Sequence, residues 1–247
     1  MKDNFSAQAF SYAQFRPVYP PELYESLLKL IKSKNVAWDC GCGNGQVAGS
    51  LATYFTEIIA TDISVRQIEH AIQKPNIQYR LLPAEKTNIA DNSVDLITVA
   101  QAIHWFNIDE FYEEVRRVSH NGTILALWCY NLLEITSEVD KIIHHLYNQV
   151  LGDQYWDPER KLIEKQYKTI PFPFDEILLP NFQIETSWNL DQLIGYLNSW
   201  SAVQHYIRKN NTNPIDALIE QFKTAWGAEK FHKVTFPIYT RVGKVRA

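Results

Sequence analysis

The sequence has little of what marks several large classes of protein. Its 247 residues include three cysteines, nine glycines and eleven prolines, and no apolar run approaches the ~18 to 20 residues that cross a bilayer. Disulfide-rich, collagenous, low-complexity and transmembrane proteins are therefore excluded. The net charge is −4, so the chain has no positive excess to attract phosphate backbones. Nucleic acid is not expected as a partner.

The cysteines and the opening segment favour a reducing compartment. Three cysteines cannot all pair, and MKDNFSAQAFSYAQ lacks the basic start, apolar centre and cleavage site of a secretory signal. We expect a cytoplasmic protein with no membrane association and no obligate protein partner. Cys40 and Cys42 form a C-x-C without a second ligand pair at metal spacing, so no zinc site is expected. Neither a G-x-S-x-G elbow nor a G-x-x-x-x-G-K loop is present, which disfavours hydrolases and nucleotide phosphatases.

Short apolar strands alternate with amphipathic helices up to Tyr130, which predicts a doubly wound open sheet with right-handed crossovers. A turn at Asn121-Gly122 is expected before the fifth strand. Residues 131–180 contain no convincing strand and offer two helical stretches. We interpret 1–247 as a single domain in which 131–180 is a helical insertion that covers one end of the sheet. The predicted strands are 36–40, 57–63, 77–82, 94–100, 123–130, 182–188 and a last one near 232–242.

The strongest signal is a cluster of glycines directly after the first strand, in Asp39-Cys-Gly-Cys-Gly-Asn-Gly. Glycines between a strand and a helix allow a tight turn. They also let a ligand approach backbone N–H groups at the positive end of the helix. A merely tight turn is the alternative, and the density of glycines at Gly41, Gly43 and Gly45 disfavours it.

The ligand of this loop is either a dinucleotide or S-adenosylmethionine. GNGQVA fits G-x-G-x-x-A, and Asp62 ends the next strand at about the twenty-residue spacing of a dinucleotide site. Asp39, however, would repel a pyrophosphate, whereas it suits the ammonium and sulfonium charges of S-adenosylmethionine. Residues 131–180 also depart from the βαβ order that a second mononucleotide half requires. A nicotinamide-dependent oxidoreductase remains the alternative.

Four segments resemble, in order and spacing, the class I S-adenosylmethionine-dependent methyltransferases. They are VAWDCGCGNGQVA, the strand ending in Asp62, Pro83-Ala84-Glu85, and NSVDLITVAQAIHWF. More narrowly, YAQFRPVYPPELYESL and AQAIHWF resemble the small-molecule group that includes the trans-aconitate methyltransferases. The resemblance covers about residues 5–130 and returns in LIGYLNSWSAVQHY and VTFPIYTRVGKV. It implies a Rossmann-like sheet of seven mostly parallel strands whose last strand is antiparallel.

The resemblance also implies roles at the cofactor. Asp39 would lie near the amino group of the methionine part, which packs on the glycines. Asp62, as an acceptor-only carboxylate, would accept both ribose hydroxyls; a helix cap beside Ser64 is its alternative. Ala84 and Glu85 would line the adenine, with a solvated loop position as the alternative for Glu85. The expected cofactor residues are Asp39, Gly41, Gly43, Gly45, Asp62, Ala84, Glu85 and Gln101, the last near the methionine end or simply in a loop.

The acceptor is expected at the C-terminal edge of the sheet, where open α/β folds bind ligands. His104 is the side chain there that can take a proton near neutral pH. A structural histidine is the alternative, because a carboxylate acceptor needs no base. SYAQFRPVYP carries two separated prolines and is expected to cross the open end as a lid, with Arg16 either an anion anchor or a surface charge. The expected acceptor residues are Tyr12, Arg16, Tyr19, His104, Trp105, Trp200 and Tyr206.

Together these patterns predict methyl transfer from S-adenosylmethionine to an oxygen of a small, acidic organic molecule, a carboxylate by preference. The sulfonium already activates the methyl group, so the protein mainly has to position two ligands and exclude water. A cofactor-binding protein without chemistry is a third interpretation.

Overall fold

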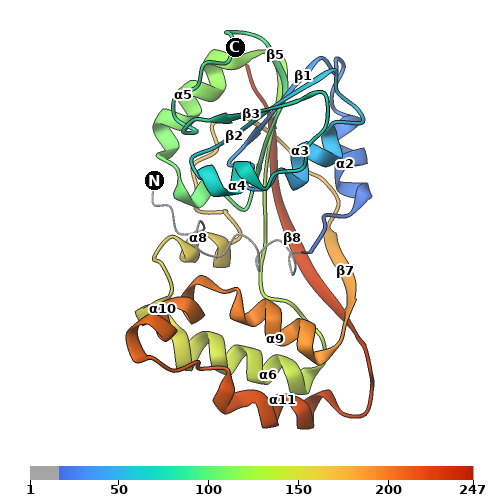
Figure 1. Ribbon diagram of the computed structural model, residues 1–247. Coiled ribbons are helices and arrows are strands. Elements are labelled where there is room, and N and C mark those ends of the chain that lie inside the picture. The colour runs from blue at the N-terminus through green and yellow to red at the C-terminus, as the bar shows by residue number, and fades with distance from the viewer. Residues whose placement is uncertain (1–16, 247) are drawn as a thin grey trace.

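The computed structural model describes residues 17–246, and its centre is one twisted sheet flanked by helices (Figure 1). The strand order is β3-β2-β1-β4-β5-β8-β6, and β7 also pairs with β8. Strands β1 to β5 pair in parallel, whereas every pairing of β8 is antiparallel. The predicted doubly wound sheet is thus confirmed. The strands are β1 (Val36–Cys40), β2 (Glu57–Asp62), β3 (Ile77–Leu81), β4 (Val94–Ala100), β5 (Ser119–Tyr130), β6 (Asp175–Ile177), β7 (Phe182–Trp188) and β8 (His232–Lys244).

The outer edge of β8 is covered by two short strands placed end to end. β6 pairs with 242–244 of β8, and β7 pairs with 232–238. The break between them exposes Leu178, of which 93% is accessible. Over residues 17–246 the sheet therefore has eight strands in seven positions. β6 lies in the segment for which no strand was predicted, because three residues between proline-rich stretches carry no readable alternation.

The Asn121-Gly122 pair lies inside β5 and not in a turn before it. Val94 pairs with Ser119 and Leu96 with Ile124, so the ladder shifts register between these pairs. Gly122 has φ +113°, a conformation that favours glycine. The predicted turn is therefore a bulge, and the strand begins before it.

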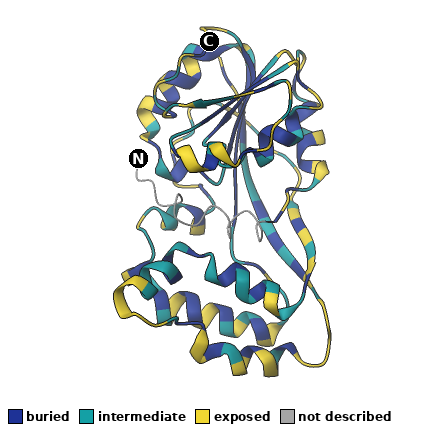
Figure 2. Ribbon diagram, in the orientation of Figure 1, coloured by how far each residue is buried: buried dark blue, intermediate teal, exposed yellow. Residues whose placement is uncertain are grey.

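Both faces of the sheet are covered, which explains why its central strands are almost continuously apolar. In β1, Ala37 packs with α2 and α3, whereas Trp38 packs on Phe111 of α5. The buried strands between these helices are dark blue in Figure 2. The flanking helices are α2 (Pro21–Leu28), α3 (Gln46–Leu51), α4 (Val65–Glu69), η2 (Ile103–Trp105) and α5 (Ile108–Val118).

A second layer of helices lies beyond one end of the sheet, joined to it by β5, β7 and β8 (Figure 1). Segment 131–180 supplies only part of this layer: α6 packs on α11, and α7 on α10. The remainder comes from the connection between β7 and β8. Within residues 17–246 no helix is long and apolar enough to cross a membrane. The helices are α6 (Ser137–His145), the π-helical η3 (Leu146–Leu151), α7 (Gly152–Tyr155), α8 (Arg160–Glu164), α9 (Leu190–Asn198), α10 (Ser201–Asn210), η4 (Asp216–Leu218) and α11 (Ile219–Trp226).

Candidate active site

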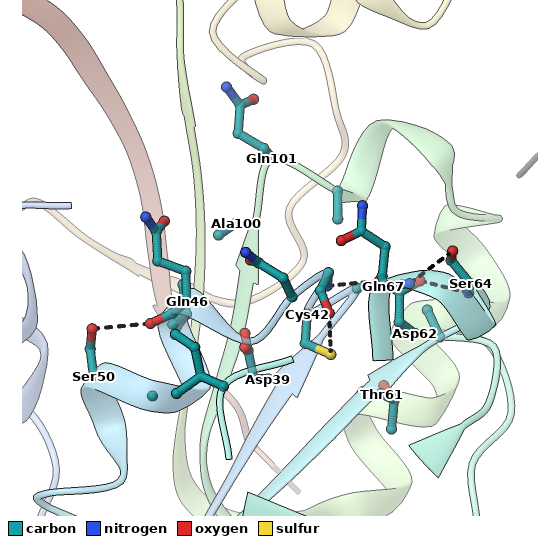
Figure 3. Close-up of a pocket in the computed structure, with 18 of the residues that line it drawn as sticks. Asp39, Cys42, Gln46, Ser50, Thr61, Asp62, Ser64, Gln67, Ala100 and Gln101 are labelled. Carbon is teal, nitrogen blue, oxygen red and sulfur yellow. Dashed lines mark hydrogen bonds between the residues drawn. The ribbon is translucent and has the colours of Figure 1, made fainter. Parts of the chain in front are cut away.

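A cavity of about 600 Å³ lies at the carboxyl ends of β1, β2 and β4 (Figure 3). This volume is within the range of ~300 to 1,000 Å³ that is usual for small-molecule and cofactor sites. Its walls are the glycine loop after β1, the end of β2 and the segment after β4. Residues that line it include Asp39, Gly41, Cys42, Gly43, Gln46, Asp62, Gln67, Ala84, Gln101 and Trp105. Gly45, which was also predicted at the cofactor, is not among the lining residues.

The glycines of the loop exclude side chains for different reasons. A Cβ on Gly41 would lie 2.6 Å from the Cβ of Ala102, and one on Gly45 would lie 2.0 Å from the hydroxyl of Tyr79. Gly43 has φ +53°, yet the nearest atom to a Cβ there is Oε1 of Gln67, 3.8 Å away. Gly41 and Gly45 are therefore required by packing. Gly43 leaves open space at the cavity wall, where a ligand can approach the backbone.

Asp62 ties the glycine loop to the end of β2. Its Oδ2 accepts the N–H of Gly43 at 2.8 Å, and its Oδ1 accepts the N–H of Ser64 at 2.8 Å (Figure 3). Ser64 in turn caps α4 by accepting the N–H of Gln67. Each carboxylate oxygen has a second lone pair. The bond to Ser64 and a role toward ribose hydroxyls are thus compatible, since the backbone donors hold the carboxylate in place.

Asp39, at the end of β1, is buried in the cavity wall. Its Oδ1 accepts the hydroxyl of Thr98 at 2.9 Å, and its Oδ2 accepts the N–H of Ala48 at 3.0 Å. Burial raises the pKa of Asp39 to about 7, with a further increase from the charge of Asp62, and the two hydrogen bonds only partly offset this. A cation brought into the cavity would restore the ionised form.

This raised pKa predicts a pH dependence of cofactor binding. Below about pH 7 Asp39 holds a proton that a bound ammonium would displace, so affinity should rise with pH up to about 7 and then level off. Titration of S-adenosylhomocysteine near pH 6, in buffers of different ionisation enthalpy, should detect proton release. Asp39→Asn should remove both effects, and equal proton release by this variant would contradict the assignment.

Ala84 and Glu85, which were both predicted to line the adenine, differ in their position relative to the cavity. Ala84 is buried and lines the cavity. Glu85 is not among the lining residues, because its Oε1 accepts the N–H of Asn107 at 2.9 Å, where α5 begins. Backbone donors at a helix start are without intrahelical partners, which explains the position of this carboxylate.

Gln101 lines the first cavity and also a second, smaller cavity that adjoins it. It has φ +55°, its N–H donates to the carbonyl of Trp128 at 2.9 Å, and its Nε2 donates to the carbonyl of Tyr130 at 3.0 Å. Its Oε1 is buried without a hydrogen-bond partner among residues 17–246. A strained backbone and a buried unsatisfied oxygen are both typical of a binding site. Figure 3 shows the side chain apart from the glycine loop, across the cavity.

A second cavity of about 100 Å³ shares Gln101 and Trp105 with the first. The predicted acceptor residues His104, Trp105 and Trp200 meet there. The other lining residues come from the helical layer or the end of β5 and were not predicted. They are Tyr130, Trp156, Asp157, Arg160, Ile163, Tyr196, Ser199 and Ser201.

The remaining predicted acceptor residues lie elsewhere. Tyr19 lines the first cavity and packs edge-on against Trp128, with ring centroids 5.5 Å apart. Tyr206 lines neither cavity, because α10 turns it toward α7, where it packs on Tyr155 at 4.9 Å. Tyr12 and Arg16 lie outside the described residues.

His104 is buried, and its Nδ1 forms a 2.8 Å hydrogen bond with the hydroxyl of Tyr167. Its ring also packs on Trp105, with centroids 4.8 Å apart. These contacts agree with the structural interpretation of this histidine, since one ring nitrogen is already engaged by the protein.

The first cavity fits S-adenosylmethionine. The open space at Gly43 admits a ligand against the backbone, and Asp39 suits its cationic methionine part. Gln101 offers a buried acceptor, and Asp62 a carboxylate held by backbone donors. With the glycine loop after β1 and an antiparallel β8, these features define a Rossmann-like methyltransferase site.

Comparison with known proteins agrees with this class. The profile of the methyltransferase domain family matches residues 38–127. A Dictyostelium discoideum protein described as a methyltransferase is 38% identical over 98% of this chain and 95% of its own length. CRG1 of Saccharomyces cerevisiae, described as an S-adenosylmethionine-dependent methyltransferase, is 24% identical over 89% and 88%. A solved structure from Anaeromyxobacter dehalogenans, described as a type II methyltransferase, superposes with a TM-score of 0.87. It is 39% identical and covers 93% of this chain and 98% of that one.

The chain therefore belongs to the class I S-adenosylmethionine-dependent methyltransferases, and S-adenosylmethionine is its methyl donor. This finding excludes the alternative that the sequence left open, a nicotinamide-dependent oxidoreductase.

Proposed function

We propose that the chain methylates a carboxylate oxygen of a small organic acid held in the second cavity. The observation that carries this proposal is that Gln101 and Trp105 line both cavities, so that an acceptor in the second adjoins a cofactor in the first. We also propose that the chain belongs to the trans-aconitate methyltransferase group and forms a single domain over 1–247. A cytoplasmic location is part of the same proposal, and the free thiols of Cys40, Cys42 and Cys129 are in keeping with it.

Within this proposal the chain's own residues bind and orient two ligands. Asp62, held in place by the N–H groups of Gly43 and Ser64, accepts the ribose hydroxyls. Asp39 balances the ammonium charge, Ala84 contacts the adenine, and Gln101 Oε1 accepts a hydrogen bond from the methionine end. S-adenosylmethionine supplies a methyl group that its sulfonium has already activated.

Transfer to a carboxylate requires no general base. A lone pair on the carboxylate oxygen forms the bond to the methyl carbon while the carbon–sulfur bond breaks, and that electron pair remains on sulfur. The acid is already ionised at neutral pH, so no proton has to move. This is consistent with the engagement of His104 by Tyr167.

The test is a screen with methyl-labelled S-adenosylmethionine against small carboxylic acids, phenols and amines. We expect label in the acids only, and alkaline hydrolysis should release it as methanol because the product is an ester. Label in a phenol or an amine, stable to alkali, with the acids inert, would contradict the carboxylate assignment.

A further inference from the structure

The second cavity contains an arginine whose position is fixed by the protein but whose charge is not paired with any carboxylate of the described residues. Arg160, at the start of α8, is partly buried, and its Nε donates to the hydroxyl of Tyr147 at 3.0 Å. The Tyr147 hydroxyl donates in turn to Glu164. The guanidinium lies over the ring of Trp156, with Cζ 5.1 Å from the centroid. These contacts hold the side chain against the cavity.

No carboxylate of residues 17–246 forms an ion pair with Arg160. Glu164 is linked to Arg160 only indirectly, because both side chains form a hydrogen bond with the hydroxyl of Tyr147. A partly buried charge without a counter-ion is costly, whereas a pair with a carboxylate in a water-poor site is strong and directional. The two terminal nitrogens of the guanidinium make no hydrogen bond to residues 17–246, which leaves them available to an anionic group of the acceptor.

The other lining residues limit what that acceptor can be. Trp105, Trp156, Tyr196 and Trp200 give the cavity aromatic walls, which favour a planar, apolar body. Asp157 lines the same cavity, and its Oδ2 is buried without a hydrogen-bond partner in the described chain. A second acid group placed there would be repelled. The small volume of about 100 Å³ excludes a large acceptor.

We propose that Arg160 binds the carboxylate of an aromatic monocarboxylic acid, which is the methyl acceptor. This inference rests on the proposed function and names the substrate class of the same site. One carboxylate oxygen is held by Arg160 while the other receives the methyl group. Methylation removes the negative charge, so the ester loses its attraction to Arg160 and product release is favoured.

The test measures binding to the protein saturated with S-adenosylhomocysteine, using calorimetry or tryptophan fluorescence. The probes are phenylacetate, its neutral analogue phenylacetamide, and the diacid homophthalate. Phenylacetate should bind about tenfold or more tightly than phenylacetamide, because a hydrogen bond between charged groups is stronger than one to a neutral amide. Homophthalate should bind more weakly than phenylacetate, and Asp157→Asn should reduce that difference.

Variants assign the effect to the guanidinium. Arg160→Met should weaken phenylacetate binding about tenfold or more while phenylacetamide and S-adenosylhomocysteine bind as before. Arg160→Lys should restore part of the preference. Arg208→Met, which removes an exposed arginine of α10, is the matched control and should change nothing. Tyr147→Phe should lower the preference for the acid only in part, because Arg160 loses one positioning hydrogen bond but keeps its charge and its packing on Trp156.

Three results would overturn the inference. The first is that the wild type shows no preference for phenylacetate, and the second is that Arg160→Met leaves the preference unchanged. The third is a full loss of preference in Tyr147→Phe, which would show that the Tyr147 hydroxyl binds the acid and that Arg160 only holds this hydroxyl in place. Failure of the proposed function looks different. In that case phenylacetate binds through Arg160, yet no acid receives label from S-adenosylmethionine.

Discussion

Replacing Gly43 by valine is expected to abolish binding of S-adenosylmethionine while the sheet stays folded. The residue has φ +53°, so a β-branched side chain is strained, and its Cβ would occupy open space at the cavity wall. A loss of about a hundredfold or more in affinity corresponds to ~2.7 kcal/mol or more. Calorimetric titration with S-adenosylmethionine measures it, and circular dichroism checks the fold.

Gly227 provides the matched control. It has φ +72° at the C-terminal end of α11, and a Cβ there meets nothing within 4 Å. Gly227→Val therefore introduces a backbone strain of ~1 to 3 kcal/mol away from the cavity, because φ +72° with ψ −151° lies in a region that is essentially restricted to glycine. It should lower the melting temperature without changing cofactor affinity. If Gly43→Val retained the wild-type affinity, the cofactor would have to bind elsewhere.

Replacing Asp62 by alanine is expected to weaken cofactor binding tenfold or more. Ribose hydroxyls left without acceptors in a closed site cost ~1 to 3 kcal/mol, and the glycine loop also loses its bond from Gly43. The dissociation constant of S-adenosylhomocysteine, measured by calorimetry, gives the size of the effect.

Two comparisons separate the effect of the lost ribose contact from the effect of the lost hydrogen bond to the glycine loop. Asp95 accepts the N–H groups of Asn35 and Val36 through Oδ2, so Asp95→Ala removes similar backbone bonds at the other end of β1. It should cost stability and leave cofactor affinity unchanged. A 3′-deoxy analogue of S-adenosylhomocysteine should bind the wild type more weakly than the parent, and Asp62→Ala should bind both alike. An equal penalty for the analogue in both proteins would refute the contact with the ribose.

The sheet was predictable where its strands are buried on both faces. The bounds of β1 and β4 match the predicted strands because each is an almost unbroken apolar run that ends at loop residues. β6 and the break at Leu178 were not predictable, since an exposed edge strand needs no apolar pattern. The helical layer was predicted in part only, because an apolar helix face does not tell whether it will pack on the sheet or on another helix.

The cofactor cavity was predictable because its polar groups lie next to one another in the sequence or at successive strand ends. Asp39 lies at the end of β1, Gly43 follows in the next loop, and Asp62 ends the neighbouring strand. The second cavity depends on long-range packing that brings Arg160 together with Gln101 and Trp200. The run from Trp156 to Arg160 combines an aromatic ring with both signs of charge, and this was the signal available in the sequence.

A crystal structure with S-adenosylhomocysteine tests the central claim most directly. The account predicts one molecule against the glycine loop, with its ribose hydroxyls on the carboxylate of Asp62, its adenine beside Ala84 and its sulfur directed toward Gln101 and the second cavity. A ligand bound outside this cavity, or with its ribose away from Asp62, would contradict the account.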